Sequence, residues 1–270
     1  MTLLVATFYT FVPIADTAPL QMPWKQAMEA HDVRGTILVA PEGLNATISG
    51  PPAGVYAVLD LIRSDARFAN IHWKESATDV QPFQKAKVRL KRETIPLGVP
   101  VNPACGCGTY VNSLEWNTLL KDPDTVIIDT RNAYEVALGR FRGALDPGTY
   151  TFKELPHWLA QNIDQLQNKK IAMYCTGGIR CEKSTAYLKD LGFTEVYHLK
   201  DGILQYLEDA QNNPDMENLW EGSCYVFDDR VAVRKDLAPD PAARLHAGTD
   251  TPLTASDLRR AYARTLNTGA

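Results

Sequence analysis

The sequence predicts an α/β protein in which an α+β sandwich precedes a domain built on a parallel sheet covered by helices. The chain has 270 residues, more than the roughly 100 to 200 of one typical domain. Hydrophobic residues make up 45% and charged residues 22%, which is typical of globular chains and excludes disordered, collagenous and coiled-coil classes. The order of strands and helices also differs between the two halves of the chain, so we expect two domains.

The N-terminal half carries a βαββαβ pattern. The turn chemistry at Glu42, Gly43 and Asn45 lies between two strands that we expect to pair. This order suits a ferredoxin-like sandwich of about 100 residues, which we assign to residues 1–97. Strands are expected at residues 3–12, 36–40, 45–49 and after the second helix, and helices at residues 20–31 and 55–67.

The second half begins after a segment rich in proline and glycine, which predicts a linker at residues 98–118. In residues 119–213, short apolar strands alternate with helices, and this indicates a parallel sheet covered on both faces. Residues 214–270 are expected to be partly extended or disordered, with a poorly ordered tail. Strands are expected at residues 126–129, 171–174 and 195–199, and helices at residues 133–138, 154–165, 179–191 and 203–210.

Net charge, hydropathy and cysteine content indicate which partners and which cellular compartment to expect. A net charge of −4 gives no global signal for nucleic acid, so any polyanion site must be a local patch. No segment approaches the roughly 18 apolar residues of a membrane span, which favours a cytoplasmic protein without a membrane partner. Five cysteines are too few for a secreted disulfide framework, so we expect free thiols. No stable protein partner is implied.

The strongest chemical signal is the loop from Cys175 to Arg180. A buried-type strand delivers Cys175 to the carboxyl edge of the sheet, and a helix starts directly afterwards. Gly177 and Gly178 let backbone N–H groups turn inward, and Arg180 adds a cation. Together these groups should lower the pKa of the Cys175 thiol and stabilise a thiolate or persulfide. The alternative is a cysteine that only packs at a strand end.

Three neighbours of this loop are candidates for supporting roles. Cys181 could act as a resolving thiol, although a buried helical cysteine that packs is the commoner outcome. Asp129 and Arg131 could orient the loop or bind substrate. Asp129 could equally cap the helix expected near Asn132.

A basic segment alternates with apolar residues near the end of the first domain. On a strand, Lys87, Arg89 and Lys91 would share one face, and Val88 and Leu90 would point to the core. Such a row can follow a phosphate backbone. An edge strand protected by lysine against aggregation explains the pattern equally well.

The cysteine loop, together with Asp129–Arg131 and the pair Tyr134 and Glu135, resembles the rhodanese family over about residues 111–212. Cys175 to Arg180 spans six residues, the size of the sulfur-handling rhodanese loop. The related Cdc25-type phosphatases use a loop one residue longer, so phosphatase chemistry is disfavoured. Gly139 and Arg140 stand where many rhodaneses have a Gly-His pair, which adds positive charge near the site.

Four segments in the same order resemble one family more closely, the bacterial tRNA uridine hydroxylases, which make 5-hydroxyuridine at the wobble position. They are residues 41–50, 87–98, 175–183 and 220–230, and the match covers about residues 3–233. The resemblance implies an oxidoreductase with catalytic Cys175 and Arg180, a tRNA anticodon stem-loop as partner and molecular oxygen as co-substrate. Two features depart from the family. The chain after Leu245 lacks the paired cysteines of many members, so no zinc site is expected there. The Cys105 and Cys107 pair is unusual and is interpreted as incidental, and no role is assigned to Cys224.

The leading hypothesis is therefore a tRNA hydroxylase whose N-terminal domain binds the stem-loop through Lys87, Arg89 and Lys91, while Cys175 meets the unstacked wobble base. The sequence carries no facial triad, haem motif or dinucleotide fingerprint, so no metal or organic cofactor is identified. Cys175 could form an adduct at C6 of the pyrimidine or carry oxygen as a persulfide or oxidised thiol. The alternatives are a persulfide sulfurtransferase and an RNA-binding regulatory protein with an inactive rhodanese domain.

Overall fold

The structure is a computed structural model that describes residues 2–245, and it divides into two units, Met1–Pro96 and Leu97–Ala270. We expect a poorly ordered C-terminal tail and no zinc site after Leu245. The residues after 245 lie outside the described part of the chain. Within residues 2–245, no helix has both the length and the apolar character needed to cross a membrane.

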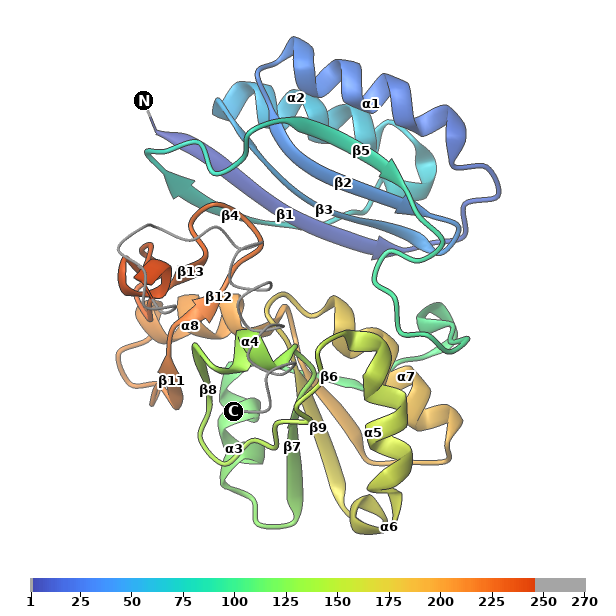
Figure 1. Cartoon of the computed structure of the whole chain (residues 1–270), viewed down its shortest axis with the longest axis vertical. Coiled ribbons are helices and arrows are strands. Elements are labelled where there is room, and N and C mark those ends of the chain that lie inside the picture. The colour runs from blue at the N-terminus through green and yellow to red at the C-terminus, as the bar shows by residue number, and fades with distance from the viewer. Residues whose placement is uncertain (1, 246–270) are drawn as a thin grey trace, which may run out of the picture. The chain divides into compact units, whose positions relative to one another are not determined.

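The first unit is a five-stranded sheet with two helices on one face (Figure 1). The strand order is β4-β1-β3-β2-β5, in which β5 runs parallel to β2 and the other neighbours are antiparallel. This topology confirms the predicted ferredoxin-like sandwich and adds an edge strand. The elements are β1 (Leu3–Phe11), α1 (Ala18–Ala30), β2 (Arg34–Ala40), β3 (Gly43–Gly50), α2 (Pro52–Arg63), a 3-10 turn (Ala66–Phe68), β4 (Trp73–Thr78) and β5 (Ala86–Leu90).

The predicted turn between the paired strands depends on Gly43. Its φ is +143°, and a Cβ there would lie 2.0 Å from the Thr10 carbonyl oxygen of β1. Only glycine fits this close backbone approach. The helices then cover an apolar core in which Trp24 packs edge-on against Phe68 at 5.5 Å between ring centroids.

The basic strand differs in part from its prediction. Lys87 and Arg89 are exposed on β5, and Val88 is buried, as the alternation requires. Leu90 is 37% exposed, so the prediction that it points into the core is wrong. It is the last residue of an edge strand, where few side chains surround it. Lys91 follows the strand, and its backbone N–H donates to the Val39 carbonyl at 2.8 Å.

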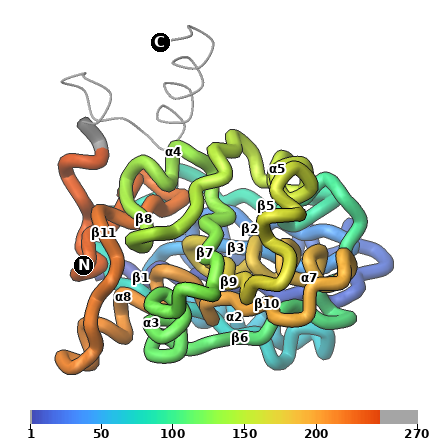
Figure 2. Tube along the Cα trace, turned by 90° about the horizontal axis from the view of Figure 1, so that it is seen from below, coloured from blue at the N-terminus to red at the C-terminus, as the bar shows by residue number. Residues whose placement is uncertain are grey.

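The second unit contains a parallel sheet of order β6-β10-β9-β7. Figure 1 shows α3 and α8 on one side of these strands and α5 and α7 on the other, as predicted from the alternating pattern. The tube in Figure 2 follows the chain through the same layers. The elements are β6 (Thr109–Val111), α3 (Ser113–Lys121), β7 (Thr125–Asp129), α4 (Ala133–Val136), β8 (Gly139–Phe141), a 3-10 turn (Phe152–Glu154), α5 (Leu155–Gln161), α6 (Ile163–Leu166), β9 (Lys170–Tyr174), α7 (Ile179–Asp190), β10 (Val196–Leu199) and α8 (Gly202–Asn212).

Part of the segment expected as a linker is regular structure. Within residues 98–118, β6 forms an edge of the parallel sheet and α3 begins at Ser113. With only three residues, β6 is too short to show the alternation of apolar and polar residues that predicts a strand. Tertiary contacts hold it instead, since the Gly108 N–H donates to the Thr185 hydroxyl at 2.9 Å. The single helix expected at residues 154–165 is divided into α5 and α6 at Asn162.

The segment after α8 is part of the second unit's core. It forms β11 (Trp220–Gly222), β12 (Cys224–Tyr225), β13 (Ala232–Val233) and a 3-10 turn (Ala242–Leu245). β11 pairs with β8, and β12 pairs with β13. Phe141 of β8 makes edge contacts with the rings of Tyr174, Tyr206 and Trp220 at 4.7 to 5.1 Å. This aromatic cluster fixes the C-terminal segment beside the sheet edge where β9 ends.

Candidate active site

Cys175 lies directly after β9, a central strand of the parallel sheet, and the residue is only 1% exposed. The loop then turns at Gly178, whose φ of +95° favours glycine, and α7 begins at Ile179. Because of this turn, the Gly178 N–H donates to the Cys175 sulfur at 3.1 Å. The strand, the glycine turn and the helix start therefore form the anion cradle expected from the sequence.

The first turn of α8 holds the loop from its other side. The N–H groups of Ile203 and Leu204 donate to the carbonyls of Cys175 and Thr176 at 3.0 and 3.2 Å. A Cβ at Gly202 would lie 2.5 Å from the Cys175 carbonyl oxygen, so only glycine permits this approach. The loop backbone is thus fixed by a neighbouring helix that the local sequence does not reveal.

The cradle stabilises the Cys175 thiolate. Burial alone would raise the pKa of this thiol, but the hydrogen bond from the Cys181 thiol, the charge of Arg180 and the N–H groups of Arg180 and Cys181 outweigh it. They lower the pKa from 9.0 to about 6. At neutral pH the sulfur is therefore mainly a nucleophilic anion.

Arg180 is held by a buried carboxylate. Its guanidinium donates to both oxygens of Glu135, at 2.8 and 2.6 Å, and both side chains are buried. Burial raises the pKa of Glu135, but Arg180 and then Arg131 reverse the shift and keep this carboxyl ionised. The bidentate pair fixes the planar guanidinium beside the cysteine loop.

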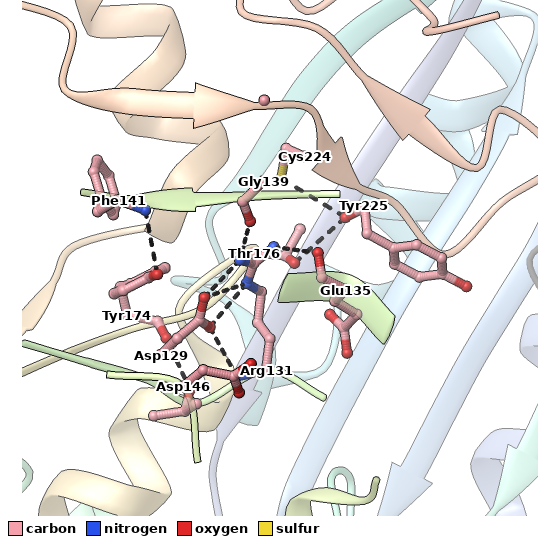
Figure 3. A network of polar contacts seen from close by, with 12 residues as sticks. Asp129, Arg131, Glu135, Gly139, Phe141, Asp146, Tyr174, Thr176, Cys224 and Tyr225 are labelled. Atoms are coloured by element: carbon pink, nitrogen blue, oxygen red, sulfur yellow. Dashed lines mark hydrogen bonds and ion pairs between the residues drawn. The ribbon is translucent and has the colours of Figure 1, made fainter. Parts of the chain in front are cut away.

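Asp129 and Arg131 form a second buried ion pair (Figure 3). The Arg131 guanidinium donates to the Asp129 carboxylate at 2.6 to 3.2 Å and to the carbonyls of Glu135 and Gly139. Asp129 therefore does not cap α4; Asn132 is the N-cap residue there. Because the side chain of Arg131 is fully buried, this pair positions α4 and β8 and does not contact solvent.

The remaining thiols differ in their surroundings. Cys181 is fully buried on the first turn of α7, hydrogen-bonds Cys175 and lies 3.6 Å from the Thr130 hydroxyl. Burial, followed by the contact with Cys175, raises the pKa of Cys181 well above its usual value. Burial also raises the pKa of Cys224 to about 12, so this thiol is protonated. Cys105 is exposed and Cys107 half-buried, and the Cys105 sulfur accepts from the Asn102 amide at 3.0 Å.

The C-terminal segment covers part of the cysteine loop. The Thr176 hydroxyl donates to the Tyr225 carbonyl at 3.4 Å. The Phe227 ring lies 5.7 Å from the Arg180 guanidinium carbon and is 45% exposed. Tyr134 of α4 packs edge-on against Tyr225.

The structure brings Cys175, Arg180, Cys181, Asp129 and Arg131 together in one unit, whereas Lys87, Arg89 and Lys91 belong to the other unit. Sequence reasoning gave no role to Glu135, although it stands in a pair that resembles rhodaneses. Phe227 and Tyr225 were also missed as site residues, because the contacts that place them are tertiary. Among residues 2–245, no three histidine, cysteine or acidic side chains come together as a metal site.

Two family models match the chain, one in each unit. Residues 3–94 match the UPF0176 acylphosphatase like domain, and residues 114–209 match the rhodanese-like domain. Two solved structures cover about two fifths of the chain: a protein of unknown function from Rhodopseudomonas palustris (26% identity, TM-score 0.34, 85% of that chain) and a rhodanese-like domain from Anabaena (18%, 0.33, 78%).

Whole-chain relatives are more similar. A protein of Rhizobium etli named tRNA uridine(34) hydroxylase is 49% identical over 94% of this chain and 82% of its own length. Proteins of the same name from Jannaschia (51% identity) and Acaryochloris marina (48%) cover 88% and 95% of this chain and 78% and 82% of their own lengths. These alignments span both units.

Proposed function

This chain belongs to the tRNA uridine(34) hydroxylase family, and we propose that it hydroxylates the wobble uridine of tRNA at C5 through the Cys175 thiolate. The observation that carries the role of Cys175 is its place in the cradle, where the Gly178 N–H donates to its sulfur at 3.1 Å and the contacts with Cys181 and Arg180 lower the pKa of the thiol to about 6. A thiolate of this kind is a strong nucleophile at neutral pH.

Attack of the thiolate on C6 of uracil would give a covalent adduct in which C5 is electron-rich. Oxygen transfer to C5, loss of the C5 proton and departure of Cys175 would then restore the aromatic ring as 5-hydroxyuridine. The overall balance is uridine, O₂, two electrons and two protons giving 5-hydroxyuridine and water. O₂ is thus the proposed co-substrate, and an external reductant supplies the two electrons.

The N-terminal unit is the proposed binding module for the anticodon stem-loop. Lys87 and Arg89 are exposed on an edge strand, and exposed Lys91 follows directly. Cationic rows of this kind neutralise backbone phosphates, whereas sequence readout in RNA requires unstacked loop bases. We therefore propose that the basic strand binds the RNA backbone and that the cysteine loop carries out the hydroxylation.

The test uses cells in which this protein is the source of 5-hydroxyuridine. The cells are grown under ¹⁸O₂, and their tRNA nucleosides are analysed by mass spectrometry. The proposal predicts 5-hydroxyuridine that carries ¹⁸O at C5. Label that comes only from water would contradict the use of O₂.

A persulfide sulfurtransferase is the competing activity, since a low-pKa thiol in a rhodanese-like domain also suits sulfur transfer. Incubation with thiosulfate distinguishes the two. Stable, transferable sulfane sulfur on Cys175, with unchanged 5-hydroxyuridine when the protein is deleted, would favour sulfur transfer. Specific tRNA binding without either product would favour a regulatory RNA-binding role.

A further inference from the structure

The turn between β12 and β13 is held rigidly. The Val226 N–H donates to the Val231 carbonyl at 2.8 Å, and the Val231 N–H donates to the Asp228 carbonyl at 3.0 Å. Asp228 is 5% exposed, and its carboxylate accepts hydrogen bonds from the Arg230 guanidinium at 2.6 and 2.9 Å. Val231 has a φ of +67°, a strained conformation for a β-branched residue that persists only where surrounding contacts enforce it.

This rigid turn presents one aromatic ring outward. Phe227 is 45% exposed, whereas its neighbours Tyr225, Val226 and Asp228 are at most 5% exposed. The ring is oriented by an edge-to-face contact with Tyr225, with 5.1 Å between centroids, and by the Arg180 guanidinium at 5.7 Å. A fixed, half-exposed aromatic ring therefore lies on the arginine that stabilises the reactive thiolate.

The electrostatic surroundings of the Phe227 ring suit a nucleic-acid base better than a phosphate. The Arg180 cation beside the Phe227 ring already forms a bidentate pair with Glu135, so it is not available to bind a phosphate. An uncharged aromatic surface attracts the flat face of an unstacked base, and proteins that bind single-stranded RNA use such rings as stacking platforms.

We propose that Phe227 is a positioning residue that stacks against the uracil ring presented to Cys175. The inference rests on the proposed function for the identity of the base, and it adds the contact that holds the base once it leaves the anticodon stack. Stacking acts on bound substrate before and during reaction, so its loss should raise KM more than it lowers kcat.

The experiment compares Phe227→Ala, Phe227→Leu and Phe227→Trp in the full chain. Removing one base-stacking ring should raise KM for tRNA by roughly 5- to 150-fold. Trp should preserve the wild-type KM because it retains a π face. Leu should behave like Ala, because it keeps apolar area without that face. Leu191→Ala is the matched control, since Leu191 is 42% exposed at the opposite end of α7 and should leave KM unchanged.

Binding by Cys175→Ser proteins separates this inference from the proposed function. Phe227→Ala should weaken binding of a stem-loop with uridine at position 34 and leave binding of the same stem-loop with an abasic position 34 unchanged. If the wild type makes no 5-hydroxyuridine, the proposed function fails, and this pair of affinities still tests the stacking. Two kinds of result would overturn the inference. One is an equal loss of affinity for both stem-loops in Phe227→Ala. The other is a wild-type KM for either Phe227→Ala or Phe227→Leu.

Discussion

The candidate active site is built around the sulfur of Cys175 and the groups that lower the pKa of its thiol. The loop from Cys175 to Arg180 could be recognised from sequence because its cysteine, glycines and arginine lie within six consecutive residues. Its carboxylate partner could not, because Glu135 lies 45 positions away and meets Arg180 only through the fold. Asp129 illustrates the same limit: local sequence allowed a helix cap, but its carboxylate binds Arg131.

At this scale we predict that alkylation of Cys175 by a small uncharged reagent titrates with a midpoint near pH 6. Arg180→Ala should move the midpoint upward, because it removes a cation and leaves the Glu135 anion nearby. Arg142→Ala is the control, since Arg142 is exposed and paired with Glu221. A midpoint that stays near pH 6 in Arg180→Ala would show that Arg180 does not stabilise the thiolate.

The buried ion pair also yields a stability prediction. Arg180→Met alone should lower the free energy of unfolding by roughly 3 to 5 kcal/mol, because it strands the Glu135 charge in the interior. The double variant Arg180→Met, Glu135→Leu should lose much less, since neither charge remains. Denaturant unfolding of the single and double variants measures both values. Equal losses in Arg180→Met and the double variant would mean that the pair contributes only packing.

At the scale of elements, long periodic segments were predictable and short ones were not. The ferredoxin-like order and the alternation of parallel strands with helices follow from periodicity. β6 was missed because three residues carry no period, and its pairing with β10 depends on contacts distant in sequence. The exposed Leu90 shows that alternation alone does not give burial at the end of an edge strand.

For β5 and the residue after it, we predict that replacing Lys87, Arg89 and Lys91 together by alanine weakens tRNA binding. Lys87 and Arg89 project from alternate positions at about 6 to 7 Å spacing, which is comparable to phosphate spacing along a strand. Loss of three phosphate contacts should reduce the slope of log affinity against log salt by roughly two to three. Alkylation of Cys175 should not change.

The charge-matched control is the triple alanine variant of Lys121, Arg142 and Lys169, each of which is exposed and ion-paired in the other unit. Its salt slope should equal that of the wild type. If the slope falls in this control instead, RNA contacts the Leu97–Ala270 unit. Arg131 could not contribute there, because its side chain is fully buried.

At the scale of the whole molecule, the chain combines two units of different topology, and a separate family model matches each of them. The resemblance of four segments pointed to one family, and relatives at 48 to 51% identity across both units establish membership. Sequence patterns pointed to the Cys175 loop and to the basic strand β5. The fold revealed two buried ion pairs, Asp129–Arg131 and Glu135–Arg180, and a C-terminal turn whose Phe227 ring lies near Arg180.

The most direct measurement is the amount of 5-hydroxyuridine in tRNA from cells that lack this protein and carry wild type, Cys175→Ala or Cys181→Ser, each at equal expression. Wild type should restore the modified nucleoside, Cys175→Ala should leave none above the deletion background, and Cys181→Ser should retain most of it. A stably expressed Cys175→Ala protein that restores near-normal 5-hydroxyuridine would contradict the role of the thiolate.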